Sequence, residues 1–403
     1  MKRIITAAAI TVAALSCSTA HAAQKPIVIG EISSYSTVPA FTIPYRNGWQ
    51  LAVEEVNAAG GLLGGRKLEV VSRDDGGKPD DAIRNANELI SNEKADILSG
   101  TFLSNVGLAV SDFALRNKVL FVAAEPLTDA LVWEKGNRYT FRLRPSTYMQ
   151  AAMLVEEAAK LPAKRWATIA PNYEYGQSAV ASFKALLKAK RPDVEFVAEQ
   201  WPALGKLEAG GTIQALEAAK PQAIFNVTFG ADLTKFVREG NLRGLFEGRS
   251  VVSMLTGEPE YLDPLKDEAP KGWIVTGYPW TQITTPAHRK FVAAYQKRYN
   301  DTPRLGSVVG YTTFMAIAAA IKKANSTDTE DLISAFRGLK VDTVFGAITF
   351  RSLDQQSTFG AFVGRLDQKD DRGVMVDWHY ADGKDYMPAD AAVKAKRPPE
   401  AMK

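Results

Sequence analysis

Few side chains in this sequence have the types and spacing that enzymes use at neutral pH. General acid–base and nucleophilic catalysis depend mainly on histidine, cysteine or paired carboxylates. Cys17 is the only cysteine, and only His288 and His379 occur beyond the first 22 residues. Neither histidine has a metal-ligand partner at the usual spacing, so we interpret both as solvent-facing. The sequence therefore predicts no enzyme, no cofactor and no metal site.

Two further motifs have simpler explanations than a ligand site. Residues Gly60 to Lys67 read GGLLGGRK, which resembles a phosphate-binding loop. In such a loop the lysine directly follows the last glycine and precedes Ser or Thr, which is not the case here. The glycines are typical of a helix C-terminus and turn. Asp74 and Asp75 lack further spaced oxygen ligands, so we interpret them as a turn before the next helix.

The N-terminus indicates export. Two basic residues precede an apolar stretch at 4–15, and Ala20-His21-Ala22 provides a small-x-small cleavage pattern. About a dozen apolar residues are too few to cross a hydrocarbon core, which needs ~20. We therefore expect a signal peptide at residues 1–22 and a periplasmic protein. Lipidation at Cys17 is the alternative, because the residues before it loosely resemble a lipoprotein box.

The composition excludes several classes of protein. The 49 basic and 45 acidic residues nearly balance, and no cluster of Lys and Arg marks a nucleic-acid surface. The most apolar later segment, Val308 to Ile321, is too short to span a bilayer. Without its signal peptide the chain contains no cysteine, so its stability must come from a large core rather than from disulfides. Its length suits two domains.

Short β-rich runs alternate with amphipathic helical runs, which is typical of α/β domains with parallel sheets. The pattern restarts after Pro145, so we expect two successive series and a ligand site where strand C-termini face the gap between them. The expected strands are 26–32, 67–73, 95–100, 119–124, 165–170, 194–200, 223–228, 250–255, 272–278, 358–366 and 374–380. The expected helices are 46–58, 79–92, 105–116, 176–189, 212–219, 232–242, 286–299 and 305–324.

An ordered set of motifs carries a family resemblance. Residues 27–30 read IVIG, residues 48–61 read G-x-x-L-A-x-x-E-x-N-x-x-G-G, and residues 75–79 read D-x-x-x-P. Further matches are Gly100 with Ser104, FR at 141–142 with PS at 145–146, YxYG at 173–176, and Tyr311 before an Ala-rich helix. The set covers nearly the whole chain and resembles type I periplasmic solute-binding proteins, the leucine/isoleucine/valine-binding group.

This resemblance implies an α/β fold of two Rossmann-like lobes joined by three crossovers. By it, lobe one comprises 26–143 plus 277–345 and lobe two comprises 144–276 plus 346–390, with a disordered tail at 391–403. It implies a monomeric component of an ABC importer that captures an amino acid, branched-chain types first, for a membrane permease, without nucleic acid. Related folds also act as ligand sensors, which stays open as an alternative.

In lobe one the resemblance also indicates which residues hold the ligand. Family members bind the ligand carboxylate with a Ser hydroxyl and backbone N–H groups before a helix, which places Ser104 and its neighbour Leu103 in the site. A helix N-terminus suits an anion. After the next strand, members offer a backbone carbonyl and a Thr hydroxyl. This sequence has Glu125, Leu127 and Thr128 there, with Glu125 as an acidic departure and Thr128 one position beyond the match.

Aromatic residues are expected to close over the solute. Tyr173 and Tyr175 lie between a strand and a helix of lobe two, and Phe229 ends a strand where relatives often carry an aromatic residue. Together with Tyr35 they can desolvate a ligand and pack against its side chain.

The class of ligand depends on an acid. Amino-acid binders of this family pair the α-ammonium with an acid after the following strand, where this sequence has Leu255 or Thr256, and Glu258 only with a shift. If Glu258 or Glu125 reaches the ligand, the solute is an amino acid. If neither does, an aromatic or keto acid without an amine fits better.

Overall fold

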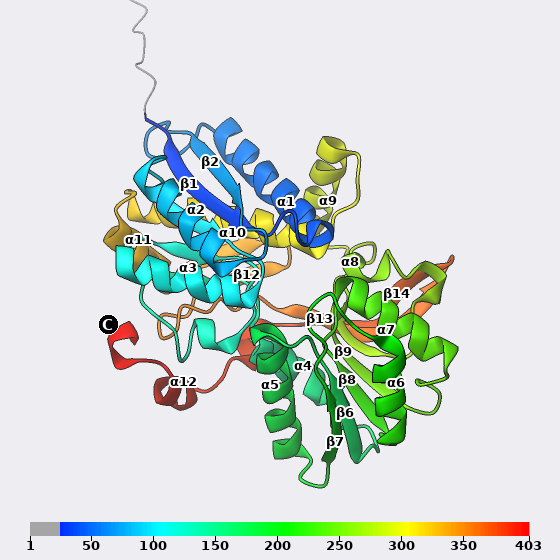
Figure 1. Ribbon diagram of the computed structural model, residues 1–403. Helices are drawn as coiled ribbons and strands as arrows, with labels where there is room; N and C mark the ends of the chain where they lie inside the picture. The colour runs from blue at the N-terminus through cyan, green and yellow to red at the C-terminus, as the bar shows by residue number, and fades with distance from the viewer. Residues whose placement is uncertain (1–24, 403) are drawn as a thin grey trace, which may run out of the picture.

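The computed structural model describes residues 25–402 and consists of two α/β lobes (Figure 1). The predicted signal peptide at 1–22 and Cys17 lie outside the described residues. A five-stranded sheet forms the centre of lobe one, and a seven-stranded sheet forms the centre of lobe two. The chain passes between the lobes after the fifth, tenth and twelfth strands along the sequence. The predicted two-lobed α/β fold is confirmed.

Lobe one has a parallel sheet in the order β2-β1-β3-β4-β5, with helices on both faces. Its strands are β1 (Ile27–Ser33), β2 (Leu68–Asp74), β3 (Ile97–Gly100), β4 (Phe121–Ala123) and β5 (Thr140–Arg142). Its helices are α1 (Pro39–Ala58), α2 (Pro79–Ser91), α3 (Ser104–Asn117), η1 (Asp129–Leu131), α9 (Pro286–Tyr299), α10 (Leu305–Ala324) and α11 (Thr329–Phe336). A small antiparallel pair, β11 (Lys340–Thr343) and β12 (Gly346–Thr349), follows α11.

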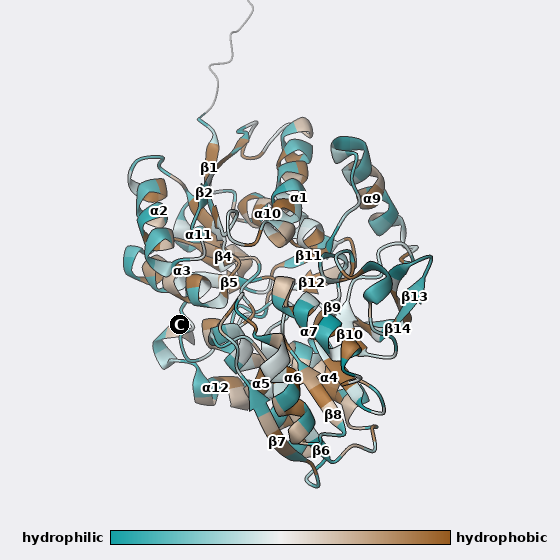
Figure 2. Ribbon diagram, turned by 45° about the vertical axis from the view of Figure 1, so that its right-hand side comes forward, coloured by the Kyte–Doolittle hydropathy of each residue, from teal (hydrophilic) through white to brown (hydrophobic). Residues whose placement is uncertain are grey.

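Lobe two has the strand order β14-β13-β10-β9-β8-β6-β7, in which β13 runs antiparallel to both neighbours. Its strands are β6 (Arg165–Ile169), β7 (Glu195–Gln200), β8 (Ala223–Asn226), β9 (Ser250–Gly257), β10 (Ile274–Gly277), β13 (Ala361–Lys369) and β14 (Arg372–Ala381). Its helices are α4 (Thr147–Ala158), α5 (Glu174–Lys190), α6 (Ala209–Ala218), α7 (Gly230–Leu242), α8 (Pro259–Leu262), η2 (Lys266–Glu268) and η3 (Gly383–Tyr386). Figure 2 shows hydrophobic residues gathered on the strands inside the lobes and hydrophilic residues on the outer helix faces.

Helices α1 and α10 cross at backbone contact in lobe one. A Cβ atom at Gly48 would lie 2.0 Å from the carbonyl oxygen of Ser307, and one at Gly310 would lie 2.1 Å from that of Tyr45. Only glycine permits this approach. Helix α10 is long and apolar enough to cross a membrane, but 78% of its most apolar window is buried in the protein. Packing in the core of lobe one therefore accounts for its apolar composition.

The C-terminal segment differs from the expected disordered tail. It forms α12 (Asp390–Lys396) and η4 (Pro399–Met402), and Val393 packs against Val132 and Trp133 of lobe one. Arg397 is buried and donates hydrogen bonds to the backbone carbonyls of Val132 and Asn137. The charged composition suggested exposure to solvent, whereas the carbonyl oxygens of a distant loop accept hydrogen bonds from the two terminal nitrogens of the guanidinium. The lobe boundary expected at 345–346 also falls between β11 and β12, which pair with each other.

Glu31 of β1 is a buried carboxyl in the core of lobe one. Its Oε2 accepts hydrogen bonds from the Tyr35 hydroxyl at 2.9 Å and the Ser72 hydroxyl at 2.6 Å. Its Oε1 has no hydrogen-bond partner within residues 25–402. Burial is the main cause that raises the pKa of Glu31 to about 8. Between pH 4.5 and about pH 8, the Glu31 carboxyl is therefore protonated in the folded protein. In the unfolded chain, where its pKa is near the ordinary 4.5, it is ionised.

We predict that Glu31→Gln makes the folded protein less sensitive to alkaline pH. Since the folded-state pKa of Glu31 is raised, its favourable contribution is complete below pH 4.5 and is lost as pH rises towards about 8. At pH near 8, the variant should exceed the wild type by about 1–3 kcal/mol in the free energy of unfolding. Urea denaturation at both ends of this window measures the difference. Glu69→Gln, at an exposed position of β2, is the control, and an equal offset at both pH values contradicts the prediction.

Candidate functional site

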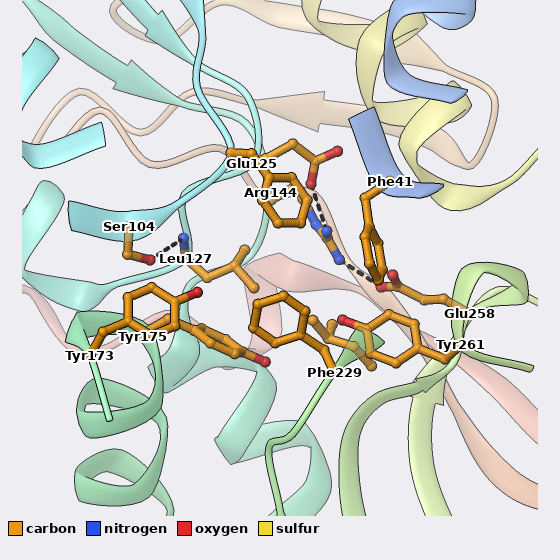
Figure 3. A pocket seen from close by; sticks show the side chains of 12 residues that line it. Phe41, Ser104, Glu125, Leu127, Arg144, Tyr173, Tyr175, Phe229, Glu258 and Tyr261 are labelled. Carbon is orange, nitrogen blue, oxygen red and sulfur yellow. Dashed lines mark hydrogen bonds and ion pairs between the residues drawn. The ribbon is translucent and has the colours of Figure 1, made fainter. Parts of the chain in front are cut away.

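A pocket between the lobes collects side chains from the C-terminal ends of strands in both sheets (Figure 3). The space between these side chains is about 360 Å³ when the part open to solvent is included. The lining residues are Phe41, Phe102, Ser104, Glu125, Leu127, Arg144, Tyr173, Tyr175, Phe229, Leu255, Glu258 and Tyr261.

Three helices begin at the pocket. The residues that precede α3, α5 and α7 are Leu103, Tyr173 and Phe229, and none of their side chains caps the helix with a hydrogen bond. The first N–H groups of these helices are thus free of side-chain caps, and each helix start carries partial positive charge. Of these three side chains, Tyr173 and Phe229 line the pocket and supply apolar surface. The arrangement can hold an anion beside an apolar group.

Ser104 starts α3 and faces the segment after β4. Its Oγ accepts hydrogen bonds from the backbone N–H groups of Leu127 and Thr128, each at 3.3 Å. Figure 3 shows the contact between Ser104 and Leu127. Because these two bonds use the lone pairs of the oxygen, the hydroxyl proton remains available for an acceptor in the pocket. Ser104 can therefore donate to a carboxylate.

Arg144 links two acidic residues from different lobes. Its Nη1 lies 2.7 Å from Oε2 of Glu125, and its Nη2 lies 2.6 Å from Oε1 of Glu258. Burial, together with the neighbouring acids Glu260 and Glu125, raises the pKa of Glu258 to about 8 although Arg144 lowers it. Burial alone would lower the pKa of Arg144, but the charges of Glu258 and Glu125 raise it overall. The guanidinium therefore stays charged.

Six aromatic rings form the remaining wall. Phe41 of α1 in lobe one lies 5.3 Å from Tyr261 and 5.9 Å from Phe229, both of lobe two, measured between ring centroids. Tyr175 lies 6.0 Å from Phe229 and 6.1 Å from Tyr173. The rings from the two lobes thus meet across the pocket. Such a wall can desolvate an apolar or aromatic solute.

The structure brings together most of the residues that the sequence predicted for the site. Seven line the pocket, namely Ser104, Glu125, Leu127, Tyr173, Tyr175, Phe229 and Glu258. Three others are not among its described lining residues. Leu103 is buried before α3, the Thr128 hydroxyl donates to Glu174, and the Tyr35 hydroxyl donates to Glu31. Contact of any of the ten with a ligand stays a prediction.

Sequence reasoning missed several lining residues, above all Arg144. This residue stands in the FRLRPS segment that carries part of the family resemblance, but nothing in the local pattern shows that its side chain enters the pocket. Phe41 was missed because α1 begins at Pro39 and not at residue 46, and Tyr261 was missed because no helix was expected at 259–262. In the sequence, Arg144 stands between the two series of strands and helices, and this position could have indicated that it lies between the two lobes.

The histidines take no part in a metal site within the described chain. His288 is buried rather than solvent-facing, and its Nε2 lies 2.6 Å from the Tyr278 hydroxyl. Burial lowers the pKa of His288, which suits a neutral core histidine. Across residues 25–402, no group of three or more His, Cys, Asp or Glu side chains could hold a metal ion.

Comparisons with known proteins agree with the two-lobed fold. A family model described as periplasmic binding protein matches residues 26–372. A "Leu/Ile/Val-binding protein homolog 7" of Brucella abortus is 25% identical, with 97% of this chain and 98% of the relative covered. A solved structure of an ABC-type branched-chain amino acid transporter from Rhodopseudomonas palustris is 25% identical, covers 92% of this chain and 100% of its own, and has a TM-score of 0.74.

A second solved structure shows the fold alone. It is a solute binding protein of an ABC transporter from Rhodopseudomonas palustris in complex with 3,4-dihydroxybenzoic acid, with 23% identity and a TM-score of 0.78. The match covers 89% of this chain and 98% of the other.

We predict that Ser104→Ala weakens binding of a small carboxylic acid. The loss of a hydrogen bond to a charged group should cost about 1.5–3 kcal/mol, or about ten- to a hundredfold in affinity. Isothermal titration calorimetry measures the change. Ser111→Ala is the matched control, because Ser111 also lies on α3 and makes buried hydrogen bonds, with Thr140 and Asn137, but does not line the described pocket. Equal affinities of the two variants would remove Ser104 from the site.

Proposed function

This chain belongs to the periplasmic binding protein family, and from this premise we propose that it captures an amino acid between its lobes for the membrane permease of an ABC importer. We further propose that it acts in the periplasm as a monomer. The names of the Brucella relatives favour a branched-chain amino acid as the solute.

The composition of the pocket carries this proposal. An α-amino acid presents a carboxylate, an ammonium and a side chain, and the pocket offers a partner for each. Ser104 and the start of α3 suit the carboxylate. Glu125 and Glu258 each give one oxygen to Arg144, and the described residues make no hydrogen bond to the other oxygen. These two oxygens can accept from an ammonium, while the aromatic wall packs against the side chain.

A second candidate is an aromatic or keto acid without an amine. The observation that favours it is Arg144, which already pairs with both glutamates. A pocket with an anion-binding end and six aromatic rings can hold a benzoate-type acid without any ammonium. The dihydroxybenzoate complex of the structural neighbour shows that the shared fold accommodates such a ligand in that protein.

Contacts between the lobes support capture by closure. Glu260 of α8 accepts hydrogen bonds from the backbone N–H groups of Leu305 and Gly306 at the start of α10, at 3.2 and 2.8 Å. The side chain of Thr128 donates to Glu174 of α5. We propose that ligand stabilises this closed arrangement and that the crossovers act as hinges.

We expect L-leucine to bind more tightly than its keto analogue, 4-methyl-2-oxopentanoate, by tenfold or more. Without the ammonium, the keto acid forms no charged hydrogen bond with the acidic side chains of the pocket, so it lacks this part of the binding free energy. A thermal-shift screen that includes benzoate and both solutes ranks them, because bound ligand raises the melting temperature by mass action. Equal or tighter binding of the amine-free acids would establish the second candidate instead.

We also expect the solute that ranks first to reduce the radius of gyration of the protein in solution. Closure moves the two lobes towards each other as near-rigid bodies. Small-angle scattering with and without saturating solute measures the change. Identical scattering curves at saturation argue against hinge closure.

A further inference from the structure

One guanidinium serves two buried carboxyl groups in the pocket. Arg144 contacts Glu125 and Glu258 at 2.7 and 2.6 Å, and the three side chains are only 3–6% exposed. Among the twelve lining residues that the structure describes, Arg144 is the only basic one. If both glutamates are ionised, the trio carries one uncompensated negative charge.

The neighbours of Glu258 do not supply the missing positive charge. The other titratable groups beside it are Glu260, Tyr175 and Tyr261, in addition to Arg144 and Glu125. Glu260 has its own partners, because it accepts from two backbone N–H groups at the start of α10. Arg304 acts on Glu260, but it pairs with Asp263 and Asp301. Among the groups named beside Glu258, Arg144 is therefore the one cation, and the others are acids and phenols.

A buried charge without a partner is costly, and a carboxyl group avoids the cost by taking a proton. One carboxyl of the trio should thus be protonated when the pocket holds no solute. The pKa of Glu258, raised to about 8 chiefly by burial, agrees with this assignment.

We propose that this trio couples the capture of an amino acid to the release of one proton. The ammonium of the solute takes the place of the proton on the carboxyl that Arg144 leaves uncompensated, and the proton passes to solvent. This inference rests on the proposed function, because it takes the solute to be an amino acid. An acid without an amine has no group to replace the proton, so its capture releases none.

The coupling has a definite sign. An amino acid binds to the deprotonated trio, so its affinity rises with pH until the carboxyl is ionised in the free protein. An amine-free acid needs the protonated trio, because otherwise the pocket gains a second unpaired negative charge. Its affinity is therefore flat at low pH and falls at higher pH. Discrimination in favour of the amino acid thus increases as pH rises.

Calorimetry in two buffers with different ionisation enthalpies counts the protons. We expect L-leucine to release about one proton at about pH 7, and its affinity to rise about tenfold between about pH 6 and pH 7. Over the same interval 4-methyl-2-oxopentanoate should release none and bind with unchanged affinity. L-phenylalanine and phenylpyruvate form a second matched pair that tests a larger side chain.

Two glutamine variants test whether the proton released on binding comes from the trio. Glu258→Gln removes one negative charge, so it should abolish proton release and lower the affinity for L-leucine about ten- to a hundredfold. The affinity for the keto acid should change little. Glu125→Gln also removes one negative charge from the trio, so it provides the test if Glu258→Gln does not fold. Glu268→Gln, an equivalent change in a surface ion pair with Arg238, is the control that should behave as the wild type.

The outcomes separate this inference from the proposed function. If an amino acid binds the wild type without proton release and with a pH-independent affinity, the coupling is overturned while the proposed function stands. Proton release that persists in both glutamine variants also overturns it. If only the keto acids bind, or none of the four solutes binds, the assignment of the ligand as an amino acid is wrong and the coupling is overturned with it.

Discussion

The bridge from Glu125 through Arg144 to Glu258 is the interaction on which the closed arrangement of the lobes depends. Glu125 follows a strand of lobe one, Glu258 follows a strand of lobe two, and Arg144 stands where the chain first crosses between them. Removing three ionisable groups from water carries a large desolvation cost that only their mutual contacts offset. The proposed opening of the lobes would separate these partners, so it would change the electrostatics of the pocket as well.

The rest of the fold holds this bridge in place. Parallel strands end at one edge of each sheet, and the helices that follow begin there, which gathers Tyr173, Phe229 and Ser104 around one space. In lobe one, backbone contact of α1 with α10 at Gly48 and Gly310 fixes the helix that carries Phe41. Lobe one thus supplies two rings of the aromatic wall and lobe two supplies four, and the wall is complete only when the two sets meet.

Much of the site could be predicted because its residues directly follow strands or precede helices. Ser104 begins α3, Tyr173 precedes α5 and Phe229 precedes α7, and at these positions local pattern and family resemblance coincide. Arg144 could not be predicted in this way, since its role depends on where a side chain in a crossover points. Tyr35 was expected in the aromatic wall, but its hydroxyl bonds to Glu31 inside lobe one, a contact that no local pattern indicates.

The sequence by itself determined the α/β class, the two successive series of strands and helices, the family, and the strand–helix junctions that hold the pocket. These features depend on periodicity and on short motifs, which act over a few residues. Only the tertiary structure decided which charges meet. Arg144 and Glu258 are 114 residues apart, and Arg397 reaches carbonyls more than 250 residues earlier. Such contacts form only when segments that are distant in the sequence have folded and packed together, so no local pattern indicates them.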